Sequence, residues 1–337
     1  MVVLYHPDCD LRFSDYGIEI PVMDDRASTV FLNLKAVDQS LEVFDPKIIP
    51  QITKADLLLA HNEDFVGRIF GTYSELEHEM MTCFELVDAN GKYHRYNPNN
   101  AKKDFTYALN IILKQTGMTY FSAKQALADG FSFFLGGGMH HAMSFGGRGF
   151  CLINDIVITL RKLQAEKLIK TAWVIDVDAH KGDGTAELTF NDPSIVTMSI
   201  HMLEGWPLDS GATTDPWFIP SNVDVGIDVG EEGQYLEYLK ASLNKLDQNY
   251  PRPDLVIVVN GADPYEHDEL PSTNPLKLTQ EQLLARDKMV YEFLLERKIP
   301  QSYAMAGGYG KRSWEIYTQF LKFVGESSSK RSEVSSR

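Results

Sequence analysis

Short apolar runs recur along the chain from about residue 130 onward, and stretches with helical periodicity separate them. The runs span residues 131–138, 172–179, 195–201, 254–263 and 302–308. They are apolar at successive positions, which is typical of parallel strands that helices cover on both faces. The pattern therefore predicts buried strands of a parallel sheet.

Amphipathic segments lie between these runs, at residues 153–170, 231–246 and 279–298. The second segment repeats leucine at the spacing of one helix face, and the third begins with Thr279 and Gln282, which fit a capping box. The alternation of strand and helix predicts a single doubly wound α/β domain over residues 1–325, with a mainly parallel sheet flanked by helices.

The patterns are weaker in the remaining segments. Residues 55–70 predict a helix, whereas the polar stretch 88–104 is typical of a surface loop. This loop and residues 14–30 are the segments that we expect to control access to a site. The tail at residues 326–337 is polar and low in complexity, so we expect it to be disordered.

Composition narrows the class of protein. The 337 residues include 44% hydrophobic positions, enough for a large core, but no apolar run is long enough to span a membrane. A formal net charge of −15 disfavours binding to nucleic acid or to anionic membranes and attracts cationic ligands. Cys9, Cys83 and Cys151 lack C-x-x-C spacing, and the N-terminus has no signal-peptide pattern, so we expect a cytoplasmic protein with reduced cysteines.

Polar clusters follow the predicted strands at the point where each strand ends. GGGMHH follows one strand, DVDAHKGDG ends the next, NGAD ends a third and AGGYG ends a fourth. Ligands of open parallel sheets bind at the carboxyl ends of the strands. These four clusters therefore predict one shared functional site.

The cluster DVDAHKGDG has the composition of a metal site. Asp178 and His180 are two residues apart, so on an extended chain their side chains project to the same side. With Asp263 they would provide three ligands and leave a coordination position open, as in catalytic zinc sites. The alternative is that Asp178 and His180 only cap a strand. Asp176 and Asp183 favour the metal, because carboxylates commonly orient histidines around bound zinc.

The pair His140 and His141 and the residue Tyr309 supply the other chemical groups. Beside a metal, the two imidazoles could act as general base and general acid, since imidazole titrates near neutral pH. Tyr309 follows two glycines, and its phenol could donate to a developing oxyanion. The alternatives are a histidine pair without function and an ordinary half-buried aromatic residue.

Taken together, these segments resemble the histone deacetylase family. GGGMHHAMSFGGRGFCLIND is similar to its tandem-histidine segment, DVDAHKGDG to its metal segment, GADPYEHDEL to its third-ligand segment and AGGYG to its tyrosine segment. The stretch AHNEDFV at residues 60–66 is similar to the family too. The forms of the third-ligand and tyrosine segments are most similar to class IV members and their bacterial relatives. The resemblance implies the arginase/deacetylase fold and a hydrolase that removes acyl groups from amines.

The resemblance also implies a role for individual residues. Zinc would be held by Asp178, His180 and Asp263, and His141 would be the general base and then the general acid. His140 would be its electrostatic partner, with Asp183 and Asp176 orienting His141 and His140 respectively. Tyr309 would polarise the scissile carbonyl. A potassium ion would be held by residues drawn from Asp176, Asp178, His180, Ser199 and Ile200, and the substrate tunnel would be lined by Gly149, Phe150 and, by position, Trp206.

The chain departs from the family pattern at three positions. Lys181 stands where relatives often have His or Asn, and we expect its side chain to point away from the metal. Ala306 replaces a glycine before the tyrosine. Acetylpolyamine-specific relatives carry a glutamate where this chain has Leu270, although Glu269 is adjacent, so the sequence favours acyl-lysine over acetylpolyamines as substrate.

Other classes of protein fit the sequence less well. An arginase-like ureohydrolase needs two manganese ions and gives no role to the histidine pair or to Tyr309. A binding protein without activity would usually lack a ligand or the tyrosine, and both are present here. The sequence does not determine the length of the acyl chain, the oligomeric state, or whether the amine belongs to a protein, a polyamine or another small molecule.

Overall fold

The protein folds around one parallel seven-stranded sheet with the strand order β1-β2-β7-β6-β3-β4-β5. The structure is a computed structural model that describes residues 2–208 and 218–335. The strands are β1 (Val2–Leu4), β2 (Phe131–Phe134), β3 (Ala172–Asp176), β4 (Ile195–Met202), β5 (Val223–Ile227), β6 (Leu255–Asn260) and β7 (Gln301–Met305). The predicted α/β class with a parallel sheet is therefore confirmed, and the edge strands β1 and β5 were not predicted.

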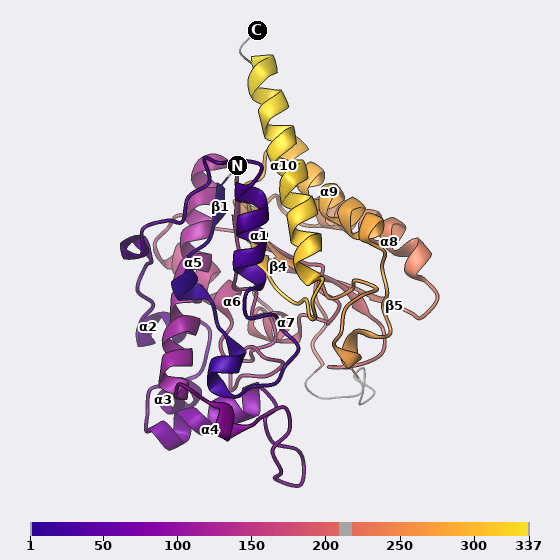
Figure 1. Cartoon of the computed structure of the whole chain (residues 1–337). Coiled ribbons are helices and arrows are strands. Elements are labelled where there is room, and N and C mark those ends of the chain that lie inside the picture. The colour runs from indigo at the N-terminus through magenta and orange to yellow at the C-terminus, as the bar shows by residue number, and fades with distance from the viewer. Residues whose placement is uncertain (1, 209–217, 336–337) are drawn as a thin grey trace.

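Helices cover both faces of this sheet, as Figure 1 shows. The longer helices are α1 (Arg26–Lys35), α4 (Tyr73–Cys83), α5 (Phe105–Asp129), α6 (Asp155–Ala165), α8 (Tyr235–Asn249), α9 (Gln280–Glu296) and α10 (Ser313–Ser335). Alternate residues of each central strand face opposite layers: in β3, Trp173 packs in the core beneath α1, α8, α9 and α10, whereas Val174 packs against α5 and α6. This two-sided burial explains the uninterrupted apolar runs.

The segment from residue 55 to 70 is not the single helix that the sequence predicted. It forms α2 (Lys54–Leu57) and α3 (Glu63–Ile69), because Asn62 adopts an extended conformation between them and its side chain accepts a hydrogen bond from the Phe65 amide at 2.9 Å. An asparagine N-cap begins a new helix and cannot continue the previous one. The capping box of Thr279 and Gln282 at the start of α9 is present as predicted.

The ends and loops complete the domain. The predicted access loops contain short 3-10 turns at Phe13–Tyr16 and Pro98–Asn100, and a third such turn lies at Pro7–Cys9. Helix α10 continues to Ser335, so it includes most of the tail that we expected to be disordered, while residues 336–337 lie outside the described range. The boundary at residue 325 stays a prediction. Among the described residues, no helix is both long enough and apolar enough to cross a membrane.

Helix α7 (Asp183–Leu188) and an apolar cluster formed by α2, α3, α4 and part of α5 lie near the site. The short helix α7 follows the segment that ends β3. Helices α2, α3 and α4 pack with the N-terminal half of α5 into a separate apolar cluster, which also contains Met139 and Cys151 from the loop after β2. The loop that carries the two histidines therefore packs into this cluster.

Candidate active site

The four polar clusters meet because the strands that they follow are neighbours. Strands β2, β7, β6 and β3 lie next to one another in the sheet and run parallel, so their carboxyl ends share one edge. His140 follows β2, Asp178 follows β3, Asp263 follows β6 and Tyr309 follows β7. The expectation of one shared site at this edge is consistent with this topology.

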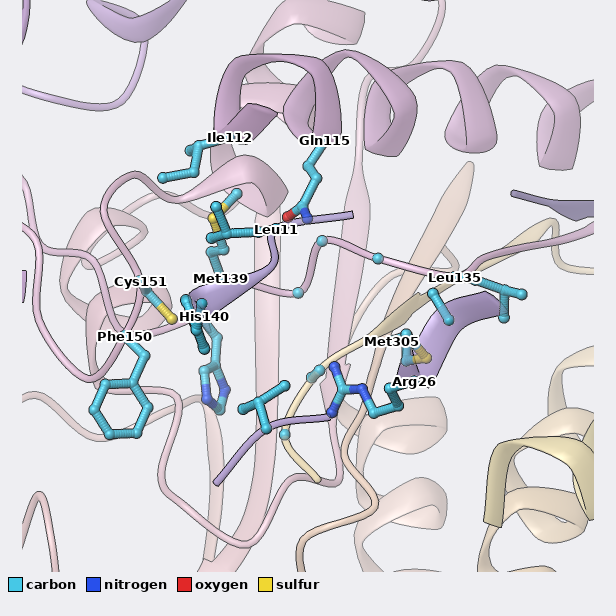
Figure 2. Close-up of a pocket in the computed structure, with 18 of the residues that line it drawn as sticks. Leu11, Arg26, Ile112, Gln115, Leu135, Met139, His140, Phe150, Cys151 and Met305 are labelled. Carbon is cyan, nitrogen blue, oxygen red and sulfur yellow. The ribbon is translucent and has the colours of Figure 1, made fainter. Parts of the chain in front are cut away.

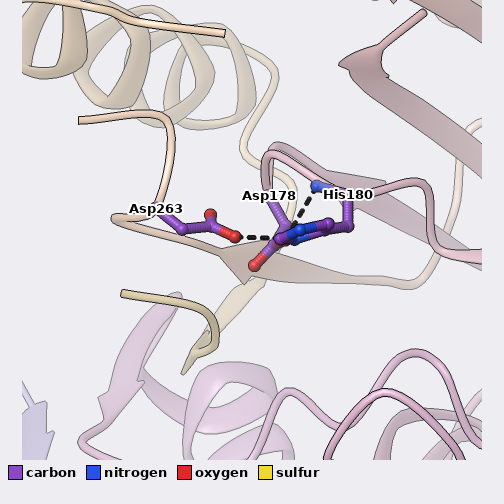
Figure 3. A group of neighbouring side chains, drawn as sticks. All are labelled: Asp178, His180 and Asp263. Atoms are coloured by element: carbon purple, nitrogen blue, oxygen red, sulfur yellow. Dashed lines mark hydrogen bonds and ion pairs between the residues drawn. The ribbon is translucent and has the colours of Figure 1, made fainter. Parts of the chain in front are cut away.

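Asp178, His180 and Asp263 form a compact buried group, which we call the metal group. Their candidate ligand atoms all lie within 4.8 Å of one another. His180 Nδ1 is 2.9 Å from Asp263 Oδ2 and 3.3 Å from Asp178 Oδ1. Figure 3 shows the Asp263 carboxylate directed at this imidazole and Asp178 beside it. Two carboxylates and one histidine are a donor set that suits zinc, and three protein ligands leave a position for water or substrate.

The electrostatics of this group also fit a cation. Burial raises the pKa of Asp263 to about 6, and the neighbouring charge of Asp178 adds to this effect. Burial would raise the pKa of Asp178 as well, but the charge of His140 and the contact with His180 hold it well below its usual range. Two buried carboxylates that repel each other are costly unless a cation lies between them.

A buried arginine fixes the distance between the two strand ends that carry these carboxylates. Arg286 of α9 is fully buried, and its Nη1 donates to the carbonyl oxygens of Val177 at 2.9 Å and Gly261 at 2.8 Å. Its Nε donates to Asp287 Oδ1 at 2.9 Å, which balances its charge. Because Val177 precedes Asp178 and Gly261 lies two residues before Asp263, Arg286 ties the two ligand-bearing segments together.

Two histidines beside the metal group are each oriented by a carboxylate. His140 Nδ1 lies 2.6 Å from Asp176 Oδ2, and His141 Nδ1 lies 2.7 Å from Asp183 Oδ1. The two ring centroids are 3.9 Å apart, and His140 Nε2 is 3.8 Å from Asp178 Oδ1. In each pair the Nδ1 hydrogen bond leaves Nε2 available for chemistry.

The two imidazoles differ in protonation. Burial would lower the pKa of His140, but the charges of Asp176 and Asp178 outweigh it and raise this pKa to about 9. Burial lowers the pKa of His141 to about 3, and the positive charge of His140 adds to the effect despite the contact with Asp183. These opposite shifts favour a protonated His140 beside a neutral His141. A neutral histidine can accept a proton, and a protonated neighbour stabilises negative charge.

The residues predicted to line the tunnel lie close to His141 and Tyr309. The Trp206 ring centroid is 4.6 Å from that of His141, and the Phe150 ring is 6.1 Å from that of Tyr309 at an angle of 70°. Gly149 has a φ of 55° and passes so close to Trp206 and His141 that a Cβ atom would collide with both rings. Only glycine fits this position.

A cavity of about 150 Å³ lies beside Gly149, Phe150 and the two histidines. It is lined by His140, His141, Asp178, His180 and Tyr309 and continues past them to apolar side chains. Figure 2 shows Ile112 and Gln115 on the α5 side of this cavity and Leu135 and Met305 at the end away from Phe150. The two histidines, Tyr309 and these apolar side chains therefore line one continuous space.

Four other predicted positions are located as follows. Ser199 and Ile200 are buried on β4, where Ser199 pairs with Asp176 of β3. Leu270 is buried in the loop after Asp263, and its amide donates to Asp268 at 2.9 Å. Lys181 is 1% exposed and forms an ion pair with Asp224 of β5.

Besides Arg286, the sequence analysis missed three residues that support the site. His61 is buried, with Nδ1 2.8 Å from the Met143 carbonyl oxygen and Nε2 accepting from the Asn154 amide at 3.0 Å. Arg148 Nη1 lies 3.2 Å from Asp183 Oδ2, and its guanidinium covers Trp206 at 5.1 Å. Asp268 accepts from the Tyr309 amide. His61 lies in the AHNEDFV stretch that resembles the family, which was its only sequence signal.

The fold and this site together define a deacetylase-type α/β protein, and comparison with known proteins places it in a family. Residues 21–321 match the family model described as the histone deacetylase domain. The chain therefore belongs to the histone deacetylase family, as the sequence motifs indicated.

Several curated proteins are similar over large parts of their length. An uncharacterized protein of Picosynechococcus is 32% identical over 60% of this chain and 64% of its own length. Histone deacetylase 2 of Arabidopsis thaliana is 27% identical over 87% of this chain and 68% of its own, and the acetoin utilization protein AcuC of Staphylococcus aureus is 29% identical over 82% and 68%. The matched region thus spans about two thirds of each of these relatives.

Solved structures share the fold at lower sequence identity. The HDA15 HD domain superposes with a TM-score of 0.69 at 19% identity and covers 96% of this chain and 88% of its own. An acetylpolyamine aminohydrolase from Burkholderia pseudomallei also gives 0.69, at 18% identity, and covers 96% and 98%. At this low sequence identity, the structural similarity establishes that the proteins share a fold.

Proposed function

We propose that this protein is a zinc-dependent amidohydrolase that removes acetyl or longer acyl groups from acyl-lysine and releases a carboxylate and a free amine. One observation carries the proposal: two adjacent histidines, each oriented by a carboxylate, lie beside a buried Asp–His–Asp group that suits zinc. Membership of the deacetylase family supports the same reaction class.

Each side chain has a defined task in this reaction. Zinc bound by Asp178, His180 and Asp263 would polarise the acyl carbonyl and lower the pKa of the attacking water. Neutral His141 takes the proton from that water and later delivers it to the departing amine, while protonated His140 stabilises the negative charge that develops. Tyr309 donates its hydroxyl hydrogen to the oxyanion. Burial raises the pKa of Tyr309 well above its usual value, so this donor stays protonated.

A second cation is part of the proposal only through the family resemblance. Asp176, Ser199 and Ile200 lie on neighbouring strands behind the zinc ligands. Both carboxylate oxygens of Asp176 already accept, from His140 and from the Asp178 amide at 3.1 Å. A potassium ion at this place would therefore depend largely on backbone carbonyl oxygens.

Acetylpolyamines or other small acylated amines are the alternative substrates. The structural likeness to an acetylpolyamine aminohydrolase and the net charge of −15 favour a cationic amine. Leu270, in place of the glutamate of acetylpolyamine-specific relatives, and the aromatic residues Phe150 and Trp206 near the histidines favour the methylene chain of acyl-lysine.

The deciding experiment measures free-amine release by the zinc-loaded protein from three substrates side by side. These are an acetyl-lysine peptide, acetylspermidine and a peptide with a long-chain acyl-lysine. We expect one of the two peptides to give the highest kcat/KM. Preference for acetylspermidine would establish the alternative, and zinc-loaded protein that hydrolyses none of the three would contradict the proposed function.

A further inference from the structure

The loop that carries Tyr309 is held by its backbone at successive residues. The Gly307 amide donates to Asp178 Oδ2 at 2.9 Å, the Gly308 carbonyl accepts from Arg26 Nη1 at 2.7 Å, and the Tyr309 amide donates to Asp268 Oδ2 at 2.7 Å. Gly308 and Gly310 have φ angles of 141° and 80° on either side of the tyrosine. Glycines allow many backbone torsions, so these hydrogen bonds determine where the loop lies.

Asp268 differs from Asp178, the other carboxylate that anchors this loop, because it is not one of the assigned metal ligands. Asp268 is 9% exposed. Its second carboxylate oxygen, Oδ1, accepts hydrogen bonds from the Leu270 amide at 2.9 Å and from Thr273 Oγ1 at 3.1 Å. One carboxylate therefore joins the Tyr309 amide to the loop that follows Asp263. Burial, together with the charge of Asp263, raises the pKa of Asp268 to about 7.

Burying a carboxylate at this place costs free energy. The hydrogen bonds of Asp268 indicate which part of the structure it holds in position. A buried carboxylate is desolvated and is tolerated when it accepts several hydrogen bonds. One of the partners of Asp268 is the main-chain amide of the residue that we assign as the oxyanion donor. A displacement of about 1 Å of such a donor can reduce the rate by about 100-fold.

We propose that Asp268 is a positioning residue for the reaction: its carboxylate fixes the backbone of Tyr309, and thereby the place of the phenol hydroxyl, relative to the Asp263 loop. The inference rests on the proposed function, because it assumes that Tyr309 stabilises the oxyanion. Asp268 acts through Tyr309 and holds neither the metal nor the substrate. Its removal therefore weakens an interaction made in the transition state and leaves ground-state binding unchanged.

Asp268→Asn tests this role, since an amide can no longer accept hydrogen bonds on both sides. We expect kcat to fall about 10-fold to 100-fold, KM to stay within about twofold, and one zinc to remain bound per chain. Thr273→Val is the matched control: it removes a hydroxyl that contacts both Oδ1 of the same carboxylate and the Leu270 carbonyl oxygen, and it leaves the bond to the Tyr309 amide. We expect its kcat to stay within about threefold of the wild-type value.

A double-mutant cycle separates positioning of Tyr309 from a general structural effect. In a Tyr309→Phe background the hydroxyl is absent, so adding Asp268→Asn should lower kcat by less than about twofold. If the two substitutions lower kcat independently, so that their fold-losses multiply in the double variant, the inference is overturned. A wild-type kcat in Asp268→Asn would also overturn it.

Two further comparisons keep the result interpretable. If Asp268→Asn does not fold, Asp268→Glu keeps the charge but moves the carboxylate by one methylene, and the same fall in kcat at unchanged KM is expected. Wild-type kcat in Asp268→Glu would overturn the inference. Wild-type protein that hydrolyses no acyl-amine refutes the proposed function, whereas active wild-type protein with an equally active Asp268→Asn refutes only the role of Asp268.

Discussion

Protonation of His61, a buried histidine outside the group of site residues, should cost stability as the pH falls. His61 is 3% exposed and links two loops, with its Nδ1 against the Met143 carbonyl and its Nε2 accepting from the Asn154 amide. Accepting that amide requires an unprotonated Nε2, so the folded state needs the neutral ring. Burial accordingly lowers the pKa of His61 from 6.5 to about 4.

The sign and size of the effect follow from these two pKa values. Below pH 6.5 the unfolded chain binds a proton at His61 that the folded protein does not bind until about pH 4. Stability from the neutral ring is therefore fully present above pH 6.5 and is lost as the pH falls through this window. Linkage over the two values gives a loss of about 2 kcal/mol at pH 5 relative to neutral pH.

Urea unfolding at pH 7.5 and pH 5 measures this loss, with a chelator present so that metal binding does not contribute. The variant His61→Gln cannot titrate, and we expect the wild-type protein to lose about 2 kcal/mol more than this variant between the two pH values. His78→Gln, at an exposed position of α4, is the matched control for loss of a histidine. Equal pH dependence in wild type and His61→Gln would refute the reasoning.

Three substitutions test the site itself. Tyr309→Phe should keep zinc and lose about 100-fold in kcat, because it removes an oxyanion donor and no ligand; unchanged kcat in a steady-state assay would exclude the assigned role. Asp178→Ala should lose zinc, and full metal content by atomic absorption would contradict the ligand assignment. Arg286→Lys should weaken zinc binding about 10-fold in a chelator competition, since lysine cannot bridge two carbonyls and a carboxylate, whereas Val290→Ala on the same helix should not.

Much of the site could be predicted because parallel strands place their carboxyl ends together. The segments around His140, Asp178, Asp263 and Tyr309 each follow an apolar run, and the apolar runs alone identified the four strands concerned. Once a parallel sheet is inferred, residues that follow its strands must lie along one edge. The family resemblance added the pairing of each histidine with its carboxylate, which spacing could not determine.

The supporting residues could not be predicted, because their partners are set by the packing of elements that lie far apart in the chain. Arg286 reaches a carbonyl 109 residues away, and its helical segment has the ordinary pattern of a surface-covering helix. Asp268 and Glu269 are adjacent acidic residues in one polar loop, and composition and periodicity do not distinguish them. The structure buries Asp268 against the Tyr309 amide but exposes Glu269, which accepts from the Lys311 amide. The difference between an anchor of the catalytic loop and a surface charge therefore arises only when the loops after β6 and β7 meet.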